Sequence, residues 1–184
     1  MKCLIKDCNI NNDKKLNDLL VVPFKTPTLE VKKLFSYFLH IAPNIESAHS
    51  KNIPIEMHAE IFERMMETRH FKHKKFCRAN AVIEKEFNKC NLNGSNICLK
   101  CKRFVCKKKQ SCKNKPEETD LNCFLRHIRN SIAHGRVYCC HAGNRIHIVF
   151  EDENITGNLS ARIVCIKADL EHWKRVLSEQ RYYQ

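Results

Sequence analysis

The sequence has no long hydrophobic run. Its longest apolar stretches, "LLVVPF" and "IHIVF", are far shorter than the roughly 20 residues that a membrane helix needs. The amino terminus, "MKCLIKDC", also lacks the hydrophobic region of a secretory signal. These two absences predict a soluble, cytoplasmic protein that does not enter a membrane.

Acidic residues are scarce relative to basic ones. The chain has 33 lysines and arginines against 20 aspartates and glutamates, which gives a formal net charge of +13. Such an excess attracts polyanions, so nucleic acid is the first partner to consider and an anionic membrane face the second. Charge alone does not choose between them.

Internal repeats are also absent. With 184 residues and 43% hydrophobic content, the chain can bury one core, so we expect residues 1–184 to form a single domain. The twelve cysteines would suggest a disulfide scaffold in a small secreted protein. Without a signal sequence, free thiols or a metal site are preferred.

The spacing of apolar residues predicts a mainly α-helical protein. We expect a short helix within residues 1–27, a core helix from Thr28 to the residue before Pro43, and one long or two consecutive helices between Ile55 and Phe87. A further helix spans residues 117–134 and ends at Gly135. Alternating apolar residues on either side of the turn "NITGN" then predict a β-hairpin, and a last helix follows from Ile166 to Leu177.

Residues 88–116 differ in character, and we interpret them as an insert between helices. They contain five cysteines and no acidic residue. One C-x2-C pair has the spacing that grips zinc, although the other spacings are irregular. The alternatives are a structural zinc held by thiolates and idle free thiols; the candidate ligands are Cys90, Cys98, Cys101, Cys106 and Cys112.

The same segment carries most of the excess positive charge. A run of this kind is usually a solvated, flexible loop. Beside a site that acts on nucleic acid, it would instead hold phosphates without reading bases. The candidate RNA-binding residues are Lys100, Lys102, Arg103, Lys107, Lys108, Lys109, Lys113 and Lys115.

Polar residues gather at the end of the helix that contains "FLRHIRNSIAHGRV". Taking the apolar stripe as zero, Arg129 falls at about 80°, Asn130 at about 180° and His134 at about 220° around the helix. All three therefore lie off the core face. Their plainest role is to interact with the negative carboxyl end of the helix.

The segment "RNSIAH" resembles the Arg-x4-His motif of HEPN domains (higher eukaryotes and prokaryotes nucleotide-binding). The resemblance implies a HEPN-type helical bundle, here with the hairpin and closing helix appended, and a homodimer in which two motifs meet. Many members are metal-independent ribonucleases of toxin or phage-defence systems, so RNA and an antitoxin or defence-system partner are implied. Other members are inactive binding or scaffolding domains, which is the alternative function.

The motif residues suit RNA cleavage. His134, with an ordinary pKa of about 6.5, can act as general acid or base at neutral pH. Arg129 supplies a fixed cation for the phosphate, and Asn130 can orient either group. RNA brings its own nucleophile, the 2′-hydroxyl, so the reaction needs no cofactor and leaves a 2′,3′-cyclic phosphate. A zinc-stabilised DNA-binding protein is a third class, but no recognition helix or finger spacing supports it.

Overall fold

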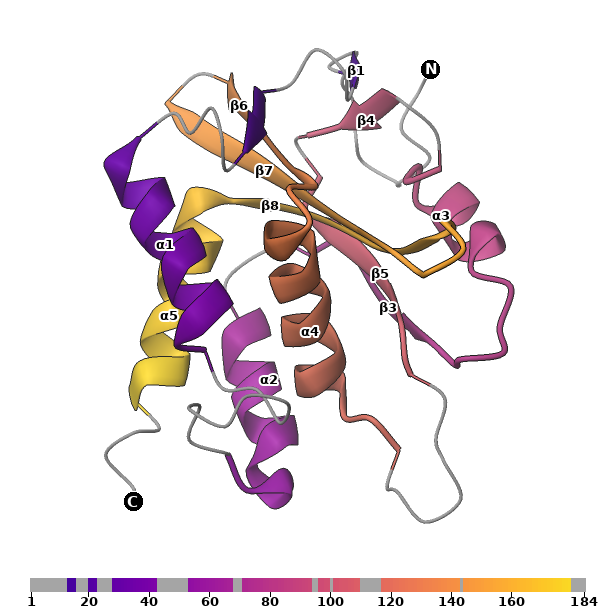
Figure 1. Cartoon of the computed structure of the whole chain (residues 1–184), viewed down its shortest axis with the longest axis horizontal. Coiled ribbons are helices and arrows are strands. Elements are labelled where there is room, and N and C mark those ends of the chain that lie inside the picture. The colour runs from indigo at the N-terminus through magenta and orange to yellow at the C-terminus, as the bar shows by residue number, and fades with distance from the viewer. Residues whose placement is uncertain are drawn as a thin grey trace.

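A mixed β-sheet forms the centre of the computed structural model, which describes residues 13–15, 20–22, 28–42, 53–67, 71–93, 96–99, 101–109, 117–142 and 144–179 (Figure 1). The strands lie in the order β2-β6-β7-β8-β5-β3, and every neighbouring pair is antiparallel except β3 and β5. A separate small sheet pairs β1 with β4. The bounds are β1 (Asp13–Lys15), β2 (Leu20–Val22), β3 (His73–Cys77), β4 (Asn96–Cys98), β5 (Arg103–Lys107), β6 (Val137–Ala142), β7 (Arg145–Glu153) and β8 (Leu159–Ile166).

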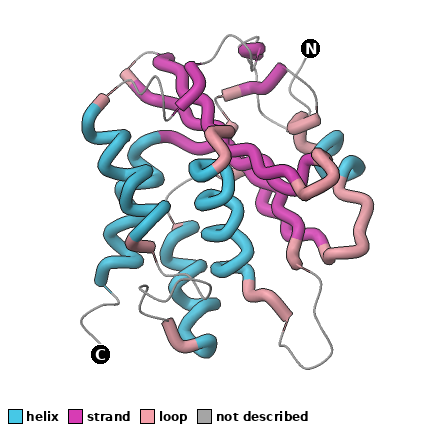
Figure 2. The backbone as a smooth tube through the Cα atoms, in the orientation of Figure 1, coloured by secondary structure: helices cyan, strands magenta, loops and turns pink. Residues whose placement is uncertain are grey.

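Helices cover the sheet unequally, with four on one face and the short α3 on the other side (Figures 1 and 2). One hydrophobic cluster joins the four helices to the near side of the strands. A smaller one joins α3, Cys90, Leu92, Ile97 and Leu99 to the far side. In β5, Phe104 belongs to the first cluster and Val105 to the second, because successive side chains of a strand point to opposite faces. The helices are α1 (Leu29–His40), α2 (His58–Met66, after the 3-10 turn η2, Ile55–Met57), α3 (Glu84–Lys89), α4 (Asp120–Ala133) and α5 (Lys167–Glu179).

The predicted fold class, a mainly α-helical bundle with an appended β-hairpin, is wrong. The protein is mixed α/β, and the hairpin of β7 and β8 lies inside the six-stranded sheet instead of beside a bundle. Residues 88–116, expected to be an insert between helices, supply β4 and β5. Because β5 pairs with both β3 and β8 and is buried along most of its length, this part of the segment belongs to the core.

Some of the predicted helices and strands are confirmed, and others are wrong. The helix after Thr28, the hairpin and the closing helix are confirmed. The helical interpretation of residues 55–87 fails in its middle, where β3 lies between α2 and α3. Leu20–Val22, expected to be helical, form a strand, and β6 was not foreseen. None of the helices in the described ranges combines the length and apolar character that crossing a membrane requires.

Helix α4 is bounded by a residue-specific cap at each end. Thr119 precedes it with extended backbone, and its hydroxyl accepts a hydrogen bond from the Asn122 N–H. At the other end, Gly135 has a φ of 66°, its N–H donates to Ile132 O, and the Arg136 N–H donates to Ser131 O. This is the Schellman arrangement, as the glycine predicted. Strand β6 begins directly after it, so the end of α4 is fixed to the sheet.

Candidate functional site

One face of α4 is left uncovered by the residues that the structure describes. The side chains of Arg129 and Asn130 are half-buried, and His134 is exposed at the helix end. Residues three and four apart on a helix are neighbours on its surface, so Asn130 adjoins His134. The structure thus places all three predicted motif residues off the core, as the helical wheel required. The open face comprises Asn122, Arg129, Asn130, Ala133 and His134.

Neither the side chain of Arg129 nor that of His134 forms a hydrogen bond or an ion pair with any described residue. His134 is the C-cap residue of α4, and its backbone N–H donates to Asn130 O. Its backbone is therefore held by the cap while its imidazole stays available. Such a pair of open cationic and titratable groups is suited to binding a phosphate and moving a proton.

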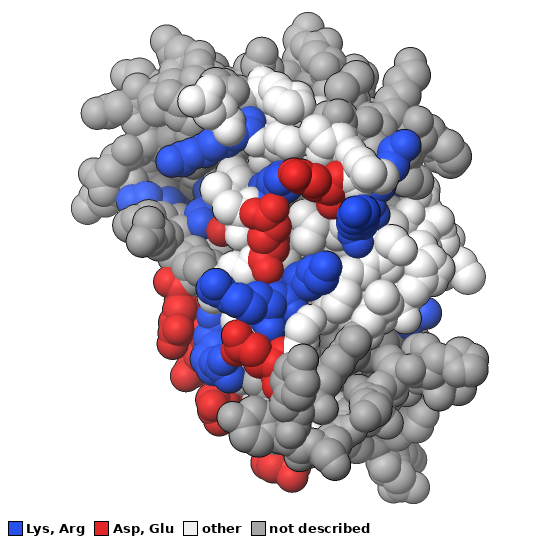
Figure 3. Space-filling view, turned by 90° about the vertical axis from the view of Figure 1, so that its left-hand side faces the viewer, with Lys and Arg blue, Asp and Glu red and all other residues white. Residues whose placement is uncertain are grey.

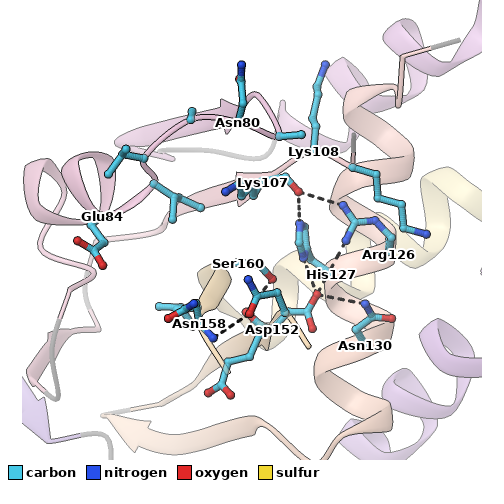
Figure 4. Close-up of a pocket in the computed structure, with 18 residues that line it drawn as sticks. Asn80, Glu84, Lys107, Lys108, Arg126, His127, Asn130, Asp152, Asn158 and Ser160 are labelled. Atoms are coloured by element: carbon cyan, nitrogen blue, oxygen red, sulfur yellow. Dashed lines mark hydrogen bonds and ion pairs between the residues drawn. The ribbon is translucent and has the colours of Figure 1, made fainter. Parts of the chain in front are cut away.

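Asn130 is tied to the sheet by a buried carboxylate. Its Nδ2 donates to Asp152 Oδ2 at 3.1 Å, which fixes the orientation of the amide (Figure 4). Asp152, near the end of β7, is almost fully buried. Because the amide nitrogen faces Asp152, the amide oxygen is turned toward other partners. Asn130 can then accept a hydrogen bond from a neighbouring donor.

His127 shares the same carboxylate from the helix turn before Asn130. Its Nδ1 lies 2.7 Å from Asp152 Oδ2, and its Nε2 lies 2.8 Å from Lys107 O (Figure 4). The ring is fully buried, and that burial lowers its pKa below the ordinary value, while the hydrogen bond to Asp152 acts in the opposite direction. His127 therefore joins α4 to β7 and β5 and does not lie on the surface.

Arg126 completes this buried network. Its guanidinium forms a two-pronged contact with Glu118, at 2.6 and 2.8 Å, and donates to Lys107 O at 3.0 Å. Burial would raise the pKa of Glu118, but the hydrogen bond and charge of Arg126 outweigh it and lower that pKa. The helix is thus anchored by charged side chains whose partners are already satisfied.

A cleft of about 690 Å³ opens beside Asn130. Its walls come from the loop before α3, the end of β5, one side of α4 and the β7–β8 turn (Figure 4). We call it the Asn130 cleft. The lining residues are Ala79–Glu84, Lys107–Lys109, Arg126, His127, Asn130, Asp152–Asn154 and Asn158–Ser160.

The eight predicted RNA-binding residues do not form one loop. Lys107, Lys108 and Lys109 line the Asn130 cleft. Arg103 is fully buried and donates to the carbonyl oxygens of Cys90, Cys101 and Asn91, which removes it from any surface that RNA could reach. The ammonium group of Lys102 is 2.6 Å from Asp169 and largely buried. The predictions for Lys100, Lys113 and Lys115 lie outside the described residues.

The candidate zinc ligands are dispersed. Cys90 lies in the cluster around α3 and Cys106 in the cluster under the four helices, on opposite faces of the sheet. Burial raises the pKa of Cys90 to about 11 and that of Cys106 as well, which favours the protonated thiols. Within the described ranges no three potential ligands gather, and Cys101 is buried. Because the structure does not describe the side chain of Cys98 or any part of Cys112, a structural zinc stays a prediction.

Away from the cleft, opposite charges are mixed. The side of the molecule that carries α1 and α5 shows basic and acidic side chains next to one another (Figure 3). Lys167, for example, contacts both Glu30 and Glu171 there. The net charge of +13 is therefore not gathered into one basic patch on this side.

Sequence reasoning missed Asp152 and did not predict that His127 is buried against it. Asp152 lies 22 residues after Asn130, in "IVFEDE", so only the tertiary fold brings them together. The one available signal was an acidic pair that directly follows buried strand residues, since acidic side chains are seldom buried without a partner.

Comparison with known proteins identifies one family. A family model described as HEPN pEK499 p136 matches residues 14–173, a range that includes the cysteine-rich segment and the whole of α4. No curated protein matches the chain, and no solved structure does.

Proposed function

Since the chain belongs to the HEPN pEK499 p136 family, a HEPN-type family with RNA-related functions, we propose that it is a metal-independent endoribonuclease acting on single-stranded RNA. The observation that carries the proposal is the placement of the motif. Arg129, Asn130 and His134 share the uncovered face of α4, and the side chains of Arg129 and His134 have no partner among the described residues. A face left open in this way is suited to meeting a substrate.

The proposed reaction is attack by the 2′-hydroxyl on the adjacent phosphorus. One His134 takes the proton of that hydroxyl, and a second imidazole returns a proton to the leaving 5′-oxygen, so the products are a 2′,3′-cyclic phosphate and a 5′-hydroxyl. Arg129 binds the non-bridging oxygens, where negative charge grows in the transition state. The amide oxygen of Asn130, turned away from Asp152, accepts a hydrogen bond from the His134 ring or the 2′-hydroxyl.

A homodimer would supply the second imidazole. The chain has one His134, and one histidine cannot easily act as base and acid in a single step. A symmetric pair that buries the open face of α4 brings two copies of the motif together. His127 is not an alternative acid, because its ring is buried and both of its nitrogens have partners.

A role in a toxin or phage-defence system, with an antitoxin or another system component as partner, belongs to the same proposal. It rests on family membership alone. A catalytically inactive HEPN protein that binds RNA or scaffolds an effector is the second candidate. The two functions differ in whether the bound RNA is cut.

Incubation of the purified protein with labelled single-stranded RNA in EDTA tests the proposal. We expect cleavage that leaves 2′,3′-cyclic phosphate ends. Replacing His134 or Arg129 by alanine should lower the rate by at least about 10²-fold, the lower range for general acid–base catalysis. Both positions lie off the core, so the melting temperature should stay within a few degrees of wild type.

Matched controls are His141→Ala and Arg145→Ala, which remove an exposed histidine and an exposed arginine of β6 and β7. Both should cut RNA at the wild-type rate. Bound but uncut RNA in the wild type would support the scaffolding candidate. Cleavage that disappears in EDTA and returns with a divalent metal would contradict the mechanism.

A further inference from the structure

We propose that the Asn130 cleft is a nucleotide-binding subsite that holds one unit of the single-stranded RNA next to the scissile phosphate. This inference rests on the proposed function. The cleft volume of about 690 Å³ falls within the roughly 300–1,000 Å³ typical of sites for small ligands. Asn130 lines this cleft and also belongs to the motif, so the cleft adjoins the motif.

One wall of the cleft is apolar and accessible. Val82 is 73% exposed although it is a large hydrophobic residue, and Ala81 and Leu159 are half-buried against the cluster around α3. All three line the cleft. These three side chains give a base ring a hydrophobic surface to lie on. Among the described residues, no Phe, Tyr or Trp side chain lines the cleft, so the contact would be aliphatic.

One edge of the cleft carries groups that suit a phosphate and a base edge. Within the described residues, neither the ammonium group of Lys107 nor the amide of Asn80 has a hydrogen bond or ion pair. Lysine ammonium groups neutralise RNA phosphates. Amide side chains both donate and accept, as base edges require. Lys109, which is exposed, adds a second cation to this edge.

The acidic groups around the cleft are largely compensated. Asp152 is buried against His127 and Asn130, and Glu153 lies 2.7 Å from Arg136. Lys108 is held by Asp120 at 3.0 Å, so it offers less charge to a ligand than Lys107. Glu84 is exposed at the rim. The positive potential inside the cleft therefore depends mainly on Lys107.

The buried network makes the back of the cleft rigid. Lys107 O accepts hydrogen bonds from both Arg126 and His127, which fixes the end of β5 against α4 (Figure 4). A nucleotide bound there would meet a preorganised surface and lose little affinity to ordering of the protein. The same contacts set the position of Lys107 relative to Asn130. A base bound in the cleft would therefore determine which phosphate of the RNA lies at the motif.

Binding of a fluorescein-labelled uridine octamer, followed by anisotropy at several salt concentrations, tests the subsite. The full chain carries His134→Ala so that the RNA stays intact. Lys107→Ala should weaken binding and lower the slope of log affinity against log salt by about 0.7, the value for one phosphate contact on a single strand. Val82→Ser should weaken binding about fivefold through lost apolar contact and leave the salt slope unchanged.

The matched control is Lys32→Ala, which removes an exposed lysine of α1 from the opposite side of the molecule. Its affinity should stay within about twofold of the parent, and its slope of log affinity against log salt should stay within about 0.2. A distant exposed charge contributes little because salt screens it. Since Val82 is exposed and Lys107 is half-buried at the cleft edge, both variants should keep the parent melting temperature.

The outcomes separate the subsite from the nuclease activity. Affinities of Lys107→Ala and Val82→Ser that equal the control would overturn the subsite, even where the wild type cuts RNA. Equal weakening by all three variants would also overturn it, because that indicates general charge attraction. Weakening confined to the cleft variants, with a wild type that never cuts RNA, would support the subsite and reject the proposed ribonuclease.

Discussion

Asp152 receives two side chains from consecutive turns of α4. His127 and Asn130 both contact its Oδ2, at 2.7 and 3.1 Å. A buried carboxylate is costly unless such partners compensate it, so each member of the group needs the others. The motif residue Asn130 therefore depends on a histidine that has no direct part in the proposed chemistry.

The protein should become less stable as the pH is lowered, because of His127. Burial lowers the pKa of the folded-state ring below its unfolded value of about 6.5, so the unfolded chain takes up a proton in a pH range where the folded chain does not. The free energy of unfolding should therefore decrease as the pH falls from about 6.5 toward the folded-state pKa. Urea denaturation at several pH values between 7.5 and 5 measures this.

His127→Gln supplies the comparison for that pH series. It should be less stable than wild type by about 1–3 kcal/mol at pH 7.5, because it disturbs the hydrogen bonds of Asp152 and Lys107 O. Its stability should then vary less with pH, since the titrating ring is gone. Identical pH slopes in the two proteins would show that His127 is not the responsible group.

For single residues, the sequence predicted the position of the motif on its helix but not the buried Asp152 that holds it. Arg129, Asn130 and His134 lie within one helix, so a period of 3.6 residues was enough to put them off the core face. Arg103 could not be predicted in the same way. Its charge suggested a surface residue, but three backbone carbonyl groups enclose it. Both Arg103 and Asp152 obtain partners only from distant segments.

Helix α4 is the element on which the site depends, and Thr119 is its N-cap. The hydroxyl of Thr119 accepts from the Asn122 N–H and also lies 2.8 Å from Nδ1 of the buried His58. Thr119→Ala should therefore lower the free energy of unfolding by about 2 kcal/mol, the upper part of the range for N-cap removal. Urea denaturation followed by circular dichroism checks this value.

Thr28→Ala is the matched control for that substitution. Thr28 caps α1 through the Val31 N–H, and no described residue gives its hydroxyl a second side-chain partner. Its loss should cost about 1 kcal/mol. Equal losses at the two caps would mean that the contact with His58 adds nothing.

Strand β3 shows why some elements escaped prediction. Its sequence, "HKKFC", has exposed lysines and little alternation, because it is an outer strand of the sheet. Phe76, Ile83 and Phe87 happen to be seven and four residues apart, which imitates a helix. In the fold, Phe76 packs toward the four helices, whereas Ile83 and Phe87 pack on the other face. The helical spacing was a coincidence of two separate elements.

The whole molecule should act as a dimer if the proposed reaction is correct. Wild-type and His134→Ala chains, mixed in equal amounts and allowed to exchange, should show about half the RNA cleavage of the same quantity of wild-type chain alone, because half of that chain enters mixed dimers with one imidazole. The cleavage rate, measured before and after exchange, checks this. An equal mass of an unrelated protein is the control.

Cleavage unchanged by the exchange would contradict the shared site. So would a fully active wild-type monomer in light scattering at the assay concentration. Full activity of the mixed dimers would indicate that each chain carries an independent site.

The strand order of the sheet also has a consequence for how the chain folds. Strands β6, β7 and β8 are neighbours both in sequence and in the sheet, and α4 directly precedes them. Contacts between segments close in sequence form with a small loss of chain entropy, so we expect this block to assemble early. The pairing of β5 with β3 joins more distant segments, and one of these carries the lysines of the Asn130 cleft. On a growing polypeptide, the motif and Asp152, which anchors it, would emerge from the ribosome after both of those segments. The cleft lysines would therefore reach their final positions only after α4 and strands β6–β8 have formed.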